Sequence, residues 1–179
     1  SISGSTGSVT KVGPAVLTVA NSSSYTGGTN LQEGGFVLSH NGALGTGALH
    51  TFADTTVELD SGITLTNDVV LESGNTTFIV SGSSTATLMS QISGVGDFTK
   101  AGKGSLKYQT NGLYDGATFV NEGILILAGN IVEPVFVASG ATLTGDGNLG
   151  FGFGSFNRII GSVNPLTVNG TSELVLYGT

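Results

Sequence analysis

The sequence contains no cysteine and no tryptophan, only three prolines, and few charged residues. Without cysteine, disulfides and thiolate metal sites are excluded. Charged residues make up 9% of the 179 residues, against about 25% in an average soluble protein. The five Lys and Arg residues are scattered along the chain, whereas nucleic-acid binding needs them clustered, so we expect no nucleic-acid partner.

Long apolar runs are also absent, and none reaches the roughly 18 residues of a membrane span. We therefore expect no direct membrane insertion of this segment. The net charge of −7 would repel an anionic membrane surface rather than bind it. The start, Ser1-Ile2-Ser3-Gly4, is not a signal peptide, so any export signal is expected outside this sequence.

Glycine is abundant, with 30 copies, and hydrophobic residues make up 39% of the chain. Apolar and polar residues alternate in short runs such as Thr56-Val57-Glu58-Leu59-Asp60 and Ala141-Thr142-Leu143-Thr144. This two-residue period is typical of half-buried strands, and turn formers such as Ser61-Gly62 and Ser139-Gly140 separate the runs. No window shows the 3.6-residue period of a helix. The pattern predicts an all-β protein without significant helix.

An internal repeat distinguishes a solenoid from a sandwich or a barrel. The segments Lys11-Val12-Gly13, Tyr25-Thr26-Gly27 and Glu33-Gly34-Gly35 recur as Lys100-Ala101-Gly102, Tyr114-Asp115-Gly116 and Glu122-Gly123-Ile124, always 89 residues later. A constant offset of this kind indicates stacked repeats. If each coil takes about 22 residues, one copy spans about four coils and the chain roughly eight.

We interpret residues 1–179 as a single β-helix segment. Repeat copy one is expected at about 2–50 and copy two at about 92–131. Intervening coils would fill 51–91 and terminal coils 132–179.

The second copy resembles the autotransporter-associated β-strand repeat. The residues that carry this resemblance stand at that family's spacings and are Lys100, Gly102, Gly104, Leu106, Asn111, Tyr114, Gly116, Thr118, Val120, Gly123, Leu125 and Leu127. The first copy departs at Pro14-Ala15, where the second has Lys103-Gly104, and at Asn21, one residue farther from its tyrosine.

The resemblance implies a right-handed parallel β-helix (β-solenoid) from the passenger domain of a Gram-negative autotransporter or a related large bacterial surface protein. It further implies export to the cell surface or the extracellular space. The usual roles of that family are adhesion, self-association and display.

Carboxylates are candidate catalytic or calcium-binding groups, because some parallel β-helices degrade polysaccharides. Five acids fall within Asp54, Glu58, Asp60, Asp68 and Glu72, but no Lys or Arg lies between Lys11 and Lys100 to bind an acidic sugar. Alternation places Glu58 and Asp60 on the strand face opposite Val57 and Leu59. We expect them to form a solvated acidic face, with calcium as the alternative to a catalytic pair.

A serine nucleophile would need a neighbouring base, and only His40 and His50 are available. These histidines flank a Gly-rich turn and are expected at the surface. We predict no catalytic residues, no cofactor and no metal ligands, and hence no enzyme activity.

The densest aromatic patch contains Phe151, Phe153 and Phe156, with Arg158 close by. Phe151 and Phe153 would share one face of an extended strand, so the patch is expected to close the end of the core or contact a partner. The segment Gly145-Asp146-Gly147-Asn148 is similar to a calcium loop, and an ordinary turn is the favoured interpretation.

The sequence leads to three functional hypotheses. The first is a non-catalytic rigid scaffold for adhesion and self-association. The second is a structural subunit of an extracellular filament or matrix. The third is a polysaccharide-degrading enzyme. The expected partners are other β-helix segments, copies of the same chain, or surface glycans and proteins.

Overall fold

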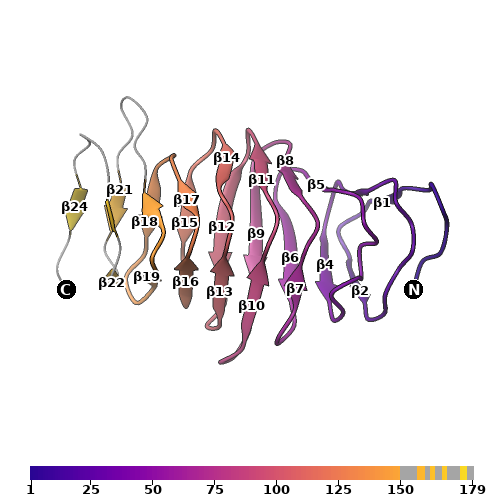
Figure 1. Cartoon of the computed structure of the whole chain (residues 1–179), viewed down its shortest axis with the longest axis horizontal. Helices are drawn as coiled ribbons and strands as arrows, with labels where there is room; N and C mark the ends of the chain where they lie inside the picture. Colours follow the sequence, from indigo (N-terminus) through magenta and orange to yellow (C-terminus); the bar gives the residue numbers. More distant parts are fainter. Residues whose placement is uncertain (150–156, 160–161, 164–166, 169–173, 177–179) are drawn as a thin grey trace.

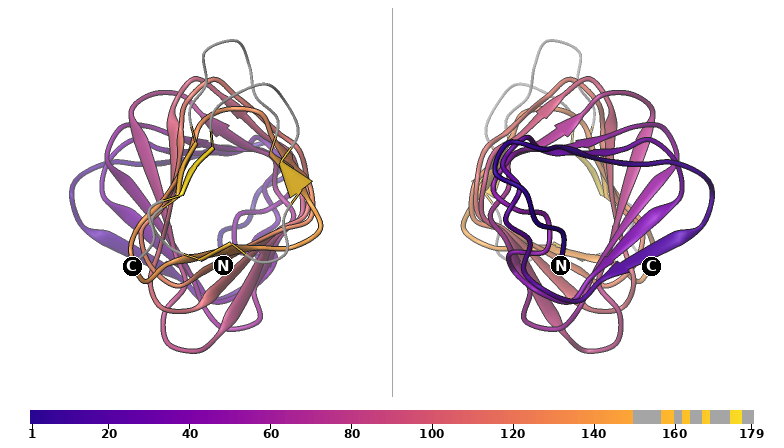
Figure 2. Two further views of the ribbon diagram at one scale, coloured as in Figure 1. Left: turned by 90° about the vertical axis from the view of Figure 1, so that its left-hand side faces the viewer. Right: turned by 90° about the vertical axis from the view of Figure 1, so that its right-hand side faces the viewer.

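The computed structural model describes residues 1–149, 157–159, 162–163, 167–168 and 174–176. Within this part the chain is all-β, and every strand pair is parallel. Successive strands follow one another along the long axis of the molecule (Figure 1), and the end-on views show the coils winding around a common axis (Figure 2). The described part contains no helix that could cross a membrane.

Three sides make up each complete coil. The first side is sheet A, with β1 (Val9–Lys11), β3 (Thr29–Leu31), β5 (Leu49–Thr51), β8 (Val69–Leu71), β11 (Ile92–Gly94) and β14 (Gly112–Tyr114). Sheet D follows it on the same side, with β17 (Asn130–Ile131), β20 (Asn148–Leu149) and β23 (Thr167–Val168).

The second side is sheet B, with β2 (Val16–Val19), β4 (Gly35–Leu38), β6 (Thr55–Leu59), β9 (Asn75–Ile79), β12 (Asp97–Ala101), β15 (Thr118–Val120), β18 (Val135–Val137), β21 (Asn157–Ile159) and β24 (Leu174–Leu176). The third side is sheet C, with β7 (Thr64–Leu65), β10 (Thr85–Leu88), β13 (Ser105–Tyr108), β16 (Ile124–Leu127), β19 (Thr142–Thr144) and β22 (Ser162–Val163).

Over residues 1–149, which are described without a gap, the solenoid makes about seven turns, close to the roughly eight coils expected for the whole chain. Coil length is not constant. Thr118 pairs with Val135, seventeen residues later, whereas Leu65 pairs with Leu88, twenty-three residues later. The parallel all-β solenoid predicted from the repeat is confirmed.

The core is a narrow column of inward side chains stacked from turn to turn. Leu106, Leu125 and Leu143 lie on neighbouring strands of sheet C and are each 0% exposed. Phe78 and Phe98 stack with ring centroids 5.2 Å apart, and the edge of Tyr108 meets Phe98 at 5.9 Å. This continuous apolar column is the burial that stabilises short strands which could not persist alone.

The two repeat copies are turned relative to each other by one side of the coil. Lys11 ends β1 in sheet A, but its counterpart Lys100 lies on β12 in sheet B. Four turns carry sheet A from β1 to β11, and Lys100 lies on the side that follows β11. One copy therefore spans four turns plus one side, and not the four coils expected from a coil length of about 22 residues.

The third side is irregular in the first turns, before sheet C begins at β7. Residues 40–45 occupy this position as a turn, with Ala43 and Leu44 each only 1% exposed. The Asn41 side chain accepts a hydrogen bond from the Thr64 backbone N–H, at 2.9 Å. This turn therefore caps the edge of sheet C, because its asparagine satisfies a backbone donor that faces the edge.

Candidate functional site

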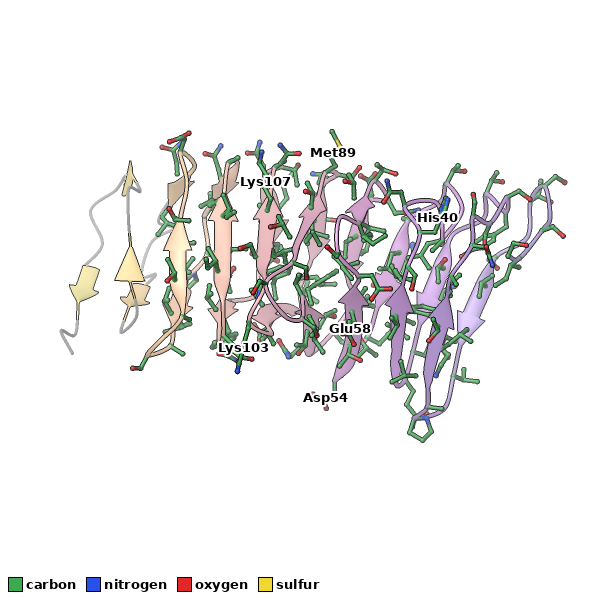
Figure 3. The ribbon with its side chains drawn as sticks, turned by 90° about the horizontal axis from the view of Figure 1, so that it is seen from below. His40, Asp54, Glu58, Met89, Lys103 and Lys107 are labelled. Carbon is green, nitrogen blue, oxygen red and sulfur yellow. The ribbon has the colours of Figure 1, made fainter. Side chains whose placement is uncertain are left out.

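The predicted acidic residues lie on the outside of sheet B and at its end. Glu58 is half-buried on β6 between the buried Val57 and Leu59, and Asp60 is exposed. The hydroxyl of Ser81 donates a hydrogen bond to Glu58 Oε1 at 2.8 Å. In the view of Figure 3, the labelled Glu58 side chain lies over the sheet B strands. Glu58 is thus held by a hydrogen bond, whereas the Asp60 side chain lies in solvent.

The five acids that are close in sequence do not converge. Glu58 lies on a strand face, Asp60 follows that strand, Asp68 precedes β8, and Asp54 and Glu72 lie between sheets A and B. Among the described residues, no group of three or more His, Asp or Glu side chains could hold a metal ion. The calcium alternative therefore has no converging ligand set in the described part of the chain.

The two histidines have separate partners. His40 is exposed, and its Nδ1 accepts a hydrogen bond from the Gly42 backbone N–H at 2.9 Å. His50 Nδ1 lies 2.7 Å from Glu72 Oε1, and these side chains are 35% and 38% exposed. The structure places both histidines at the surface, as the sequence predicts.

The aromatic patch lies largely outside the described residues. Phe151, Phe153 and Phe156 are not described, and Arg158 is described only as part of β21. Its role at the end of the core stays a prediction. In the Gly/Asp segment, Gly145 has φ +121° and a Cβ there would collide with the Leu127 carbonyl oxygen. This close approach accounts for the glycine as a corner residue.

Both repeat copies contain an arrangement that sequence reasoning missed, which we call the lysine clamp: a lysine ammonium bonded to three backbone carbonyls. Lys100 Nζ donates to the carbonyls of Ala101 at 2.8 Å, Gly102 at 2.6 Å and Glu122 at 3.0 Å. The first two oxygens belong to one turn and the third to the next. The clamp therefore joins adjacent turns at a corner.

Lys11 forms the same clamp in copy one. Its Nζ donates to the carbonyls of Val12 at 3.1 Å, Gly13 at 2.6 Å and Glu33 at 3.0 Å. The glycines at the two corners, Gly13 and Gly102, have φ of +78° and +76°, which orients their carbonyls toward the ammonium. The sequence contains a signal for this contact. In both copies Lys-x-Gly is followed by Glu-Gly, with the glutamate 22 residues after the lysine.

Burial separates the two clamps. Lys100 replaces an inward apolar residue between Phe78 and Val120 and is 0% exposed, whereas Lys11 is half-buried in the first turn. Burial lowers the pKa of Lys100 from 10.5 to about 8, and the nearby Glu122 carboxylate opposes this shift. The lysine is a structural group whose charge is costly to bury.

A second shared contact fixes the preceding corner of each copy. The Tyr25 hydroxyl lies 2.6 Å from Thr29 Oγ1, and the Tyr114 hydroxyl lies 2.5 Å from Thr118 Oγ1. All four residues are buried. Burial raises the pKa of both tyrosines. The Tyr-x-Gly-x-Thr motif thus satisfies polar groups inside the core.

Outward residues differ between the copies at equivalent positions. Asn30 corresponds to Phe119, and Thr18 corresponds to Lys107. Phe119 is half-buried on sheet B and stacks on Phe136 with centroids 5.2 Å apart. The repeat thus preserves the internal contacts while the outer surface varies.

Two kinds of curated protein are similar to this chain. The Adhesin BmaC autotransporter of Brucella suis biovar 1 (strain 1330) is 33% identical over 134 residues, which cover 67% of this chain and 4% of that protein. An extracellular serine protease of Serratia marcescens is 39% identical over 59 residues, which cover 33% of this chain and 6% of the protease. A further extracellular serine protease of Serratia marcescens is 36% identical over 59 residues.

No family model matches the chain, and no solved structure matches it. The chain spans only a small fraction of the curated relatives. The similarity and the parallel solenoid together support an autotransporter passenger-like domain in an exported or surface protein.

Proposed function

We propose that this segment is a non-catalytic, rigid scaffold of an exported bacterial surface protein, on which variable outer residues support adhesion and self-association. The observation that carries this proposal is that the two repeat copies share their internal contacts and differ in their outward residues. They share the lysine clamp and the buried tyrosine–threonine contact but differ at outward positions such as Asn30 and Phe119. A fold-determining interior with a changeable exterior suits a scaffold.

The similarities favour the same role. One relative is an adhesin autotransporter and others are extracellular serine proteases, so similar segments occur in surface and extracellular proteins with different activities. We further infer that the solenoid is right-handed, because parallel crossover connections nearly always are.

Self-association would use the first strands of sheets A and B. The Val9 N–H donates to the Gly28 carbonyl and the Lys11 carbonyl accepts from the Gln32 N–H, so these alternate residues face β3. Thr10 lies between them and directs its backbone N–H away from β3. By the same alternation Thr18 faces away from β4, since Val19 accepts from the Ser39 N–H. This strand edge is a template for a further coil, either of the same polypeptide or of another copy.

Analytical ultracentrifugation and negative-stain imaging of the chain test this arrangement. We expect concentration-dependent linear assemblies that the double variant Thr10→Pro/Thr18→Pro shortens, because proline removes the edge donors. The matched control Thr10→Val/Thr18→Val keeps both donors and should assemble like the wild type. Assemblies unaffected by the prolines would contradict end-to-end pairing.

The filament or matrix subunit is the second candidate, and the same strand edge favours it. Fibres that grow without limit in the imaging experiment would select this alternative, whereas short assemblies favour the adhesive scaffold. Adhesion is tested separately by binding the fluorescently labelled chain to arrays of glycans and matrix proteins.

A further inference from the structure

Exposed apolar side chains gather on one edge of the solenoid, where sheet A and its continuation in sheet D meet sheet B. Val95 is 63% exposed, Leu113 is 57% exposed and Val132 is 41% exposed. The Asp115 N–H donates to the Gly94 carbonyl, which places Asp115 beside Val95 on the next turn. Thr118 pairs with Val135, so the same register places Val132 next to Asp115 on the following turn. Asp115 therefore lies between Val95 and Val132. We call Val95, Leu113, Asp115, Val132 and Glu133 the acidic edge.

The charges of this edge are unneutralised in the described structure. Asp115 is exposed and Glu133 half-buried, and neither carboxylate has an ion pair or hydrogen bond among the described residues. Asp97 lies two residues beyond Val95 on the same edge. Surface of this composition favours a partner that combines positive charge with apolar groups.

The opposite side of the same turns has this complementary composition. Lys103 is exposed at the corner that leads into β13, and Lys107 is half-buried on the outer face of that strand. Lys107 pairs in register with Ile126 and Ser105 with Ile124, and both isoleucines are half-buried on the outer face of sheet C. We call Lys103, Lys107, Ile124 and Ile126 the basic face.

Both lysines of the basic face are available for an external partner. Lys11 and Lys100 are engaged in the clamps, whereas Lys103 and Lys107 have no ion pair or hydrogen bond within the described part of the chain. The order of the sheets around the coil is A, B, C, so sheet C lies across the axis from the edge between A and B. One molecule therefore cannot bring its own two surfaces together.

We propose that the acidic edge of one copy docks on the basic face of a second copy, so that solenoids associate side by side. The acidic edge lies on turns five to seven and the basic face on turns five and six, so the axes of the paired copies can run alongside each other. The contact is heterologous, since each copy uses a different surface, and it leaves one free surface at each end of a row. This proposal rests on the proposed self-association and adds a lateral contact, distinct from pairing at the strand edges.

Charge reversal provides the test, with sedimentation velocity as the measurement. The base-reversed variant Lys103→Glu/Lys107→Glu and the acid-reversed variant Asp115→Lys/Glu133→Lys should each associate at least about tenfold more weakly than the wild type. An equimolar mixture of the two variants should recover association, because acidic surfaces on one then meet basic surfaces on the other. Recovery of this kind cannot come from misfolding, and far-UV circular dichroism checks each variant's fold.

Matched controls distinguish a contact through the acidic edge from an effect of net charge alone. Asp60→Lys/Asp68→Lys makes the same change in net charge as the acid-reversed variant. It lies outside the acidic edge and adds no negative charge to the basic face, so it should leave association intact. Leu113→Ser should weaken association, whereas Met89→Ser, at a similarly exposed position (57% and 55%), should not.

Several outcomes would overturn lateral docking. A chain that stays monomeric at all concentrations contradicts it, and so does an equal loss in the Asp60/Asp68 control. Association abolished by Thr10→Pro/Thr18→Pro but insensitive to charge reversal would leave end-to-end pairing standing and refute the lateral contact.

Discussion

The lysine clamp of copy two gives the sharpest stability prediction, because copy one supplies the same contact in a more exposed setting. In Lys100→Met the alkyl packing is largely kept and the amine is lost. The Ala101 carbonyl still accepts from the Val80 N–H at 3.1 Å, so two of the three carbonyls, those of Gly102 and Glu122, lose their donor. Both bonds are part-buried, so leaving these two carbonyls without a donor costs at most about 4 kcal/mol in all.

The charge of Lys100 offsets part of this cost at neutral pH. A pKa lowered from 10.5 to about 8 means that burying the charged lysine reduces the stability of the folded state by about 3 kcal/mol at pH 7. The methionine variant is spared that cost, so its net loss of stability at pH 7 should be only about 1 kcal/mol.

The loss should increase with pH. Between pH 8 and 10.5 the folded lysine is neutral while the unfolded one still binds a proton, so wild-type stability rises with pH. A neutral amine has two hydrogens, enough for the two carbonyls that lack another donor. We expect the deficit of Lys100→Met to reach about 3 kcal/mol near pH 9.5, where the tyrosines of the unfolded chain affect both proteins alike.

Urea unfolding of the wild type, Lys100→Met and Lys11→Met from pH 7 to 9.5 measures this. Lys11 is half-buried, so water can replace its ammonium at the carbonyls and Lys11→Met should cost less than about 1 kcal/mol. A deficit of Lys100→Met that shrinks with pH, or one equal to that of Lys11→Met throughout, would refute the reasoning.

Three further predictions concern the corners, the tyrosines and catalysis. Gly123→Ala should lower the free energy of unfolding by more than about 3 kcal/mol, because its φ is +70° and a Cβ would meet the carbonyls of Gly102 and Gly104. The control Gly62→Ala, at φ +78° with open space, should lower it by about 1 kcal/mol. Equal shifts of the melting temperature in the two variants would contradict the steric account. Tyr114→Phe should cost about 1–2 kcal/mol, since the Thr118 hydroxyl loses its partner. Because burial raises the pKa of Tyr114, wild-type stability should fall as pH rises through the tyrosine range of the unfolded chain, and the phenylalanine variant should lose less. We expect the wild-type chain to turn over neither acidic nor neutral polysaccharides. Turnover by the wild type that disappears in Glu58→Ala/Asp60→Ala would favour the polysaccharide-degrading enzyme over the scaffold.

The candidate surfaces show how unevenly sequence and fold contribute. Alternation alone places Glu58 outside and Val57 inside, because successive side chains on a strand point to opposite faces. No local pattern brings Val95, Asp115 and Val132 together, since they lie on three different turns. Their proximity depends on coil lengths of 20 and then 17 residues at this edge, which corner loops set.

The sequence by itself determined the all-β class, the stacking and the repeat, because a two-residue period and a constant 89-residue offset are readable along the chain. Only the tertiary structure showed that the second copy starts one side further round the coil, so that Lys11 joins corners after sheet A and Lys100 after sheet B. The physical reason is that the repeat is fixed by contacts between adjacent turns, such as the clamp. These contacts can form at any corner, so the sequence period need not be a whole number of turns.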